Sequence, residues 1–192
     1  MNEMTPSQRR WLLLLALIAG VLALDLVSKQ AIIDTLVRGE TREPIPALVP
    51  YFQITLSYNS GAAFGILPQA SDVFLVIAIV VVIGLMIFYP RLPEPAHLSR
   101  MALGMIIGGA LGNAIDRIQH GHVIDFIHYR VPTLDISNVS NIADHAIVLG
   151  VIIMFIDSWL VERHEKRAEA AAAEAPPPNI TGNSPSDEQI DV

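Results

Sequence analysis

The hydrophobic residues of the chain gather in four long apolar segments separated by polar stretches. These segments are residues 11–29, 73–89, 100–117 and 141–161. A helix needs roughly 20 residues to cross the hydrocarbon core of a bilayer, and each segment approaches this length. The pattern therefore predicts an all-α integral membrane protein with four transmembrane helices. The third and fourth segments differ from the second because each carries an aspartate at one end.

The first apolar segment has one alternative interpretation, a cleaved signal peptide, because Arg9 and Arg10 precede it. A signal peptide ends in an A-x-A-like cleavage site after a short apolar core. No such site follows here, and three more apolar segments lie downstream. We therefore expect a retained helix.

The polar stretches at residues 30–72 and 118–140 lie on the same side of the predicted bundle. Within the first, "FQITLSY" alternates and is rich in β-forming residues, which predicts a small antiparallel β-element. The following "NSGAAFG" (59–65) is typical of a tight turn of small residues. The second stretch is expected to be a short loop.

The composition supports a membrane protein. Hydrophobic residues make up 52% of the chain and charged residues 16%, whereas soluble domains carry about 25% charged residues. The absence of cysteine excludes disulfides, thiolate catalysis and cysteine-based zinc sites. Residues 168–192 are rich in Ala, Pro and acid, so we expect a membrane domain over 1–167 and a disordered tail over 168–192.

Basic residues indicate the orientation of the four spans. Seven of the 12 Lys and Arg residues lie on the side of the termini and five on the other side. Because cytoplasmic loops carry an excess of Lys and Arg, both termini are expected in the cytoplasm. The two polar stretches then lie outside.

Two carboxylates, Asp125 and Asp144, stand out on this outer side. Asp125 follows the third span and Asp144 begins the fourth, so the two can meet at one boundary of the bundle. Neighbouring carboxylates tend to share one proton and can activate a water as base and acid. This arrangement suggests hydrolysis of an amide at the membrane surface.

Other polar residues lie on helix faces near the same boundary. Asn113, Asp116 and Arg117 share one face, and Asp116 and Arg117 form either part of a site or an interfacial pair. Asp25 and Lys29, at i and i+4, form either a salt bridge or a wall of the site. Residues 104, 108 and 112 are glycines at four-residue spacing, which favours close packing of helices.

Four other kinds of function have weaker support in the sequence. A metal site would use residues from the set His120, His122, His128 and His145, but no three-ligand spacing appears. A serine hydrolase would use Ser60, Ser137 or Ser140, but G-x-S-x-G is absent. A transporter should carry acids near mid-membrane and often shows a helix repeat, whereas a scaffold gives no reason for two aspartates at one boundary.

The motifs together resemble the lipoprotein signal peptidases, the bacterial signal peptidase II family. The matching stretches are "DLVSK" (25–29), "NSGAAFG" (59–65), "GGALGNAIDRIQHGHVIDF" (108–126) and "NIADHAIVLG" (141–150). The resemblance covers about residues 10–165. It implies the catalytic pair Asp125 and Asp144. Further motif positions are Asp25, Lys29, Asn59, Gly61, Ala63, Asn113, Asp116, Arg117, Val123, Asn141 and Ala143.

The resemblance also implies an activity. The family consists of membrane aspartic endopeptidases that remove signal peptides from prolipoproteins, cutting before a diacylglyceryl-modified cysteine. We expect no cofactor, no metal and no nucleic-acid partner, and a monomer in contact with membrane lipid in the bacterial cytoplasmic membrane, with the site near the outer face. Ser140 departs from the pattern, since the family usually has an aromatic residue there, and this puts the local packing in question.

Overall fold

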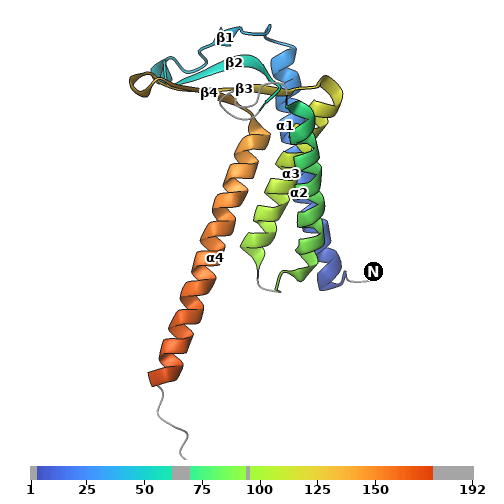
Figure 1. Cartoon of the computed structure of the whole chain (residues 1–192), viewed down its shortest axis with the longest axis vertical. Helices are drawn as coiled ribbons and strands as arrows, with labels where there is room; N and C mark the ends of the chain where they lie inside the picture. The colour runs from blue at the N-terminus through green and yellow to red at the C-terminus, as the bar shows by residue number, and fades with distance from the viewer. Residues whose placement is uncertain (1–3, 62–69, 94–95, 175–192) are drawn as a thin grey trace, which may run out of the picture. The chain divides into compact units, whose positions relative to one another are not determined.

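A computed structural model describes residues 4–61, 70–93 and 96–174. Four of its helices are long and apolar enough to cross a membrane, which confirms the predicted class (Figure 1). They are α1 (Pro6–Ile33), α2 (Ser71–Phe88), α3 (His97–His120) and α4 (Ile142–Glu174). The chain divides into two compact units, residues 1–157 and 158–192.

The first unit contains a four-stranded antiparallel sheet of order β1-β2-β3-β4. The strands are β1 (Thr41–Arg42), β2 (Phe52–Asn59), β3 (Val123–Val131) and β4 (Ile136–Ser140). The β-element predicted in the first polar stretch is therefore present. The second stretch, expected to be a short loop, adds a hairpin and gives the sheet its other two strands.

Three short 3-10 helices complete the regular structure of the described residues. They are η1 (Pro46–Leu48), η3 (Tyr89–Arg91) and η4 (Pro132–Leu134). The last of these connects β3 to β4. At the other end of β3, Gly121 closes α3 with φ of 73°, a left-handed conformation that glycine adopts without strain. The chain can therefore turn directly from α3 into the sheet.

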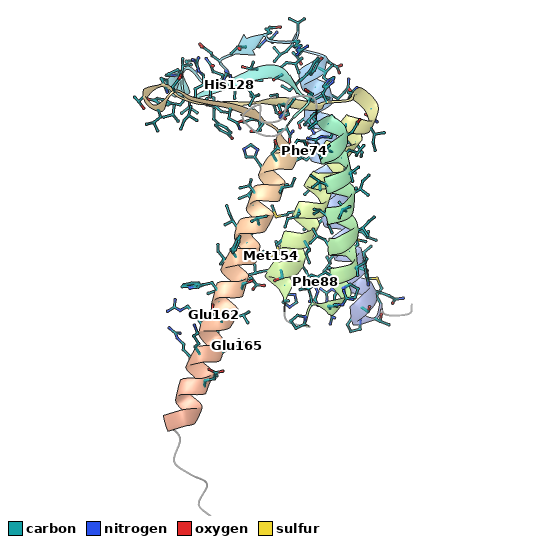
Figure 2. All side chains as sticks on the ribbon, in the orientation of Figure 1. Phe74, Phe88, His128, Met154, Glu162 and Glu165 are labelled. Carbon is teal, nitrogen blue, oxygen red and sulfur yellow. The ribbon has the colours of Figure 1, made fainter. Side chains whose placement is uncertain are left out.

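Helix α3 is the centre of the helical part. In an 18-residue apolar stretch of α3, 61% of the residues are buried, whereas 17% or less are buried in the corresponding stretches of the other three helices. Its Leu103 and Ile107 form a core cluster with Leu14, Ile18 and Tyr89. Met154 of α4, labelled in Figure 2, packs against this cluster. The apolar residues that α1 and α2 leave exposed suit contact with lipid.

Glycines bring neighbouring helices close to α3, as the four-residue spacing predicted. A Cβ placed on Gly108 would lie 2.9 Å from the Cβ of Val21 on α1. Gly112 leaves room for the Asp25 carboxylate of α1. Gly109 lies on the face of α3 toward α4, where it contacts Ala143 and Ile147. The glycines therefore let α3 approach both α1 and α4, and they admit a carboxylate between helices.

Helix α4 continues to Glu174, beyond residue 167, where the tail was expected to begin. In the second unit, the Arg163 guanidinium lies 4.6 Å from the Trp159 ring, and Lys166 pairs with Glu162 at 2.6 Å. Residues 175–192 lie outside the described part of the chain. The disordered tail therefore stays a prediction there.

Candidate active site

Asp125 and Asp144 lie on different elements and are linked through two asparagines. Asp125 is on β3 and 2% exposed, and Asp144 is in the first turn of α4. The side-chain amide of Asn141 donates to Asp125 Oδ1 at 2.7 Å, and that of Asn113 donates to Asp144 Oδ1 at 2.7 Å. Asn141 Nδ2 also lies 3.1 Å from Asn113 Oδ1. The four side chains thus form one connected group.

Electrostatics favour a proton on Asp125. Burial, and after it the charge of Asp144, raises the pKa of Asp125 to about 7. Hydrogen bonds from Asn59 and Asn141 act in the opposite direction. Asn59, at the end of β2, donates to Asp125 Oδ2 at 2.9 Å. Each oxygen of Asp125 is therefore held by an amide, while the neighbouring carboxylate disfavours a second negative charge.

A buried ionic cluster supports this pair from α1 and α3. Lys29 Nζ lies 2.7 Å from Asp25 Oδ2 and 2.7 Å from Asp116 Oδ2, and it donates to Asn113 Oδ1 at 3.2 Å. The three charged side chains are at most 2% exposed. Asp25 and Lys29 therefore form a salt bridge that is buried rather than interfacial, and Asp116 is the third member of this cluster.

The same cluster holds the backbone segments that carry the dyad. Asp25 Oδ1 accepts from the backbone N–H of Ala143 at 2.9 Å, at the start of α4. Asp116 Oδ2 accepts a hydrogen bond at 3.0 Å from the backbone N–H of Ile124, the residue before Asp125. Lys29 thus fixes two carboxylates that in turn fix the neighbours of Asp125 and Asp144.

Arg117 lies beside the pair. Its guanidinium is close enough to Asp144 and Asp125 to interact with both charges. Nη1 donates to the Asn113 carbonyl at 3.3 Å, and the guanidinium carbon lies 5.6 Å from the ring of Phe74 on α2. Its Nε is buried without a hydrogen-bond partner among the described residues.

The remaining motif positions have simpler roles. Val123, 2% exposed, pairs with Asn59 across the sheet, and Ala143 is fully buried. The backbone N–H of Gly61 donates to Asn59 Oδ1 at 3.0 Å, which orients the amide that binds Asp125. Ala63 and the rest of "NSGAAFG" beyond Gly61 lie outside the described residues.

Ser140 is accommodated at the end of β4. It is 8% exposed, and its hydroxyl donates to the Ile127 carbonyl of the neighbouring strand at 3.4 Å. Ser140 and Ile127 are also paired in the strand register. The serine therefore fits the sheet by bonding to its backbone.

A sequence model of the family described as Signal peptidase (SPase) II, peptidase family A8, matches residues 17–160. The chain belongs to the signal peptidase II family. This membership confirms the predicted enzyme class and the function of a lipoprotein signal peptidase.

Curated relatives and solved structures agree with the family. The lipoprotein signal peptidase of Moorella thermoacetica is 42% identical over 74% of this chain and 88% of its own length. That of Photorhabdus laumondii is 41% identical over 79% of this chain and 88% of its own. A bacterial membrane enzyme solved by the in meso method at 2.3 Å superposes with a TM-score of 0.71 at 33% identity, over 80% of this chain and 90% of that one.

One contact at the site of this signal peptidase II was not predicted. His145, a candidate metal ligand in the sequence, donates from Nδ1 to the Asn141 carbonyl at 2.6 Å, and its Nε2 lies 2.9 Å from the Tyr129 hydroxyl. It thus connects β3 to the start of α4. Its position next to Asp144 was the one sequence signal for this role. Within the described residues, His, Asp and Glu form no group of three or more that could hold a metal.

Proposed function

We propose that Asp125 and Asp144 are the catalytic pair of this peptidase. In this proposal they hydrolyse the bond before the diacylglyceryl-modified cysteine of a prolipoprotein. The observation that carries it is the bridge through Asn141 and Asn113, which joins one carboxyl group with a pKa of about 7 to a second carboxylate. Such a pair supplies an acid and a base together.

In the proposed mechanism Asp144 is ionised and Asp125 is protonated. Asp144 removes a proton from a bound water as its oxygen attacks the scissile carbonyl. Asp125 donates its proton to the carbonyl oxygen, which gives a neutral gem-diol. The gem-diol then collapses: a gem-diol hydroxyl returns its proton to Asp125, the proton on Asp144 passes to the leaving nitrogen, and the C–N bond breaks. No covalent acyl-enzyme forms.

The asparagines and Arg117 divide the supporting roles. Asn113 and Asn141 use their amides to position the two carboxylates. In this proposal the same asparagines also bind the substrate backbone. Arg117 is the candidate donor for a substrate carbonyl, because its guanidinium charge lies beside the pair. A guanidinium also suits the negative charge that develops on the carbonyl oxygen.

The proposed location of the site follows because its residues lie at the same end of several helices. Asp25 and Lys29 lie in the last turns of α1, Asn113 to Arg117 in those of α3, and Asp144 in the first turn of α4. In our proposal this end faces the outside of the bacterial cytoplasmic membrane and both termini are cytoplasmic, in accord with the basic residues. The enzyme acts as a monomer without a metal or another cofactor.

The substrate lipid is central to the proposal. Each methylene buried in the bilayer contributes about 0.8 kcal/mol, so two acyl chains hold the modified cysteine at a fixed depth. A site at the end of the spanning helices matches that depth. The test compares one precursor before and after diacylglyceryl transfer to its cysteine, incubated with the purified enzyme. We expect cleavage of the lipidated form, whereas equal cleavage of both forms would contradict the lipid requirement.

A further inference from the structure

A cavity lies at the opposite end of α1 from the aspartates. It has a volume of about 680 Å³ and is lined by the first turns of α1, the start of α3 and Tyr89. Arg9, in its wall, precedes Asp25 by sixteen residues of one helix, which at 1.5 Å per residue is about 24 Å. The cavity is therefore separate from the catalytic pair.

The cavity combines an apolar wall with basic groups. Its apolar lining includes Leu13, Leu14, Leu17 and Met101, and the basic side chains are Arg9, Arg10, His97 and Arg100. None of the described residues that line it is acidic. A ligand that fills this space should therefore carry both a negative charge and a hydrocarbon part.

Hydrogen bonds and a contact between aromatic rings hold the wall of the cavity in place. Arg100 Nη2 donates to the carbonyls of Leu92 at 3.1 Å and Pro93 at 2.8 Å. The Tyr89 hydroxyl donates to the Arg10 carbonyl at 2.9 Å, and its ring, 3% exposed, meets Trp11 edge-on at 4.8 Å. The basic groups are thus attached to an ordered surface, which reduces the entropy lost on binding.

We propose that this cavity binds an anionic phospholipid, with the phosphate among the basic residues and an acyl chain along the leucines. Leu13 lines the cavity yet is 61% exposed, and on a membrane-spanning helix such a surface faces lipid. A free phosphate would use only the charged rim and leave this apolar wall unfilled. The site goes beyond the proposed function and does not depend on it.

Native mass spectrometry of the full chain tests the charge requirement, with phosphatidylglycerol and phosphatidylcholine as probes in equal amounts. We expect preferential retention of phosphatidylglycerol, and Arg9→Gln should weaken it about fivefold, the effect of one basic residue at an anionic surface. The matched control is Arg91→Gln, an exposed arginine at the same end of the helices that does not line the cavity. Equal retention of the two lipids, or an equal loss in both variants, would overturn the proposal.

A second pair of variants tests the apolar part without changing any charge, which also guards against an altered membrane orientation. Leu13→Trp should fill the cavity and lower phosphatidylglycerol retention severalfold. Leu12→Trp, at a neighbouring position that is 53% exposed and does not line the cavity, should leave it unchanged. If glycerol phosphate without acyl chains competes as well as the lipid does, the site binds a soluble anion and the proposal is wrong.

Discussion

The side-chain amide of Asn141 donates to Asp125 at 2.7 Å, while its carbonyl oxygen accepts the backbone N–H of Asp144 at 2.9 Å. One asparagine therefore touches both residues of the proposed catalytic pair. It sets the position of the Asp125 carboxyl group relative to the first turn of α4. Because a pair that shares a proton depends on the relative position of its two carboxyl groups, substitution of either one should change the rate of substrate cleavage.

The first prediction concerns the pair itself. Asp144→Asn should lower kcat by about 10²- to 10⁴-fold, the usual contribution of a general acid or base. Its folding should be retained, because Asn113 contacts one carboxylate oxygen and an amide oxygen can replace it. Turnover of a lipidated precursor and thermal unfolding in detergent are the measurements.

Asp125→Asn should lose activity to a similar extent but also lose stability. Both oxygens of Asp125 accept hydrogen bonds from amide nitrogens, so an introduced NH₂ group would meet another NH₂ group. The cost of one such buried mismatch is about 1–3 kcal/mol. Asp135→Asn, an exposed residue of the same sheet region, is the control. Near-normal turnover of either dyad variant would show that the assignment of the pair is wrong.

The pH dependence should follow the raised pKa of Asp125, which is about 7. The mechanism needs Asp125 protonated, so kcat/KM should fall as the pH rises through about 7. The folded protein also binds this proton more tightly than the unfolded chain, whose pKa is near 3.8. The free energy of unfolding should therefore decrease as the pH rises between these two values.

Kinetic profiles and unfolding curves across this range measure both effects. The stability effect should be absent in Asp125→Asn, which has no titrating group at this position. If kcat, measured with saturating substrate, falls at the same alkaline pH as kcat/KM, the result agrees with a protonated Asp125. Activity that rises steadily above pH 7 would contradict it.

The sequence predicted the four spans from the length of the apolar segments, and it predicted that two aspartates meet at one end because neighbouring spans are antiparallel. It did not predict that Asp125 lies on a strand. Its segment pairs with β2, where Asp125 lies opposite Ser57, a partner far away in the sequence. Local alternation in so short a stretch could not identify that pairing.

The support of the pair was also only partly predictable. The i and i+4 spacing predicted the contact between Asp25 and Lys29, but the third member, Asp116, comes from another helix. The backbone donors at Ala143 and Ile124 carry no side-chain signal at all. Such contacts depend on how closely α1 and α3 pack, which the glycines permit but do not specify.

The buried cluster gives a stability prediction. Lys29→Met should destabilise the protein by about 3–5 kcal/mol, because it leaves two buried carboxylates without their cation. Thermal or denaturant unfolding in detergent measures it. Lys166→Met is the control, since the Lys166–Glu162 pair has the same kind of bond but Lys166 is 71% exposed, and such pairs contribute about 0–1 kcal/mol. A similar small effect in both variants would show that the cluster is not a major stabilising element.

The end of the chain should be dispensable. Deletion of residues 175–192 leaves α4 intact, and the Pro- and acid-containing composition of this segment offers few apolar side chains to bury. We expect turnover and the unfolding temperature to stay near those of the full chain. A clear loss in either would indicate that the segment docks on the enzyme, and a deletion of only residues 185–192 would then locate the docking part.

The last prediction concerns Asp157, an ionisable residue within the fourth span. Its carboxylate accepts hydrogen bonds from both the backbone N–H and the hydroxyl of Ser99. Helix α3 has Ala96 at its N-cap position, without a side-chain cap, so Asp157 supplies from α4 the acceptor that α3 lacks. Asp157→Ala should therefore cost about 0.5–2 kcal/mol of stability, as loss of a helix cap does.

The activity of Asp157→Ala should stay close to normal, because Ser99 lies at the end of α3 opposite to Asn113 and the catalytic pair. Unfolding in detergent and turnover of a lipidated precursor, measured on one preparation, separate the two effects. Asp72→Ala is the matched control, since Asp72 is an exposed acid in the first turn of α2. A loss of turnover in Asp157→Ala without a loss of stability would contradict a purely structural role and would instead couple the two ends of α3.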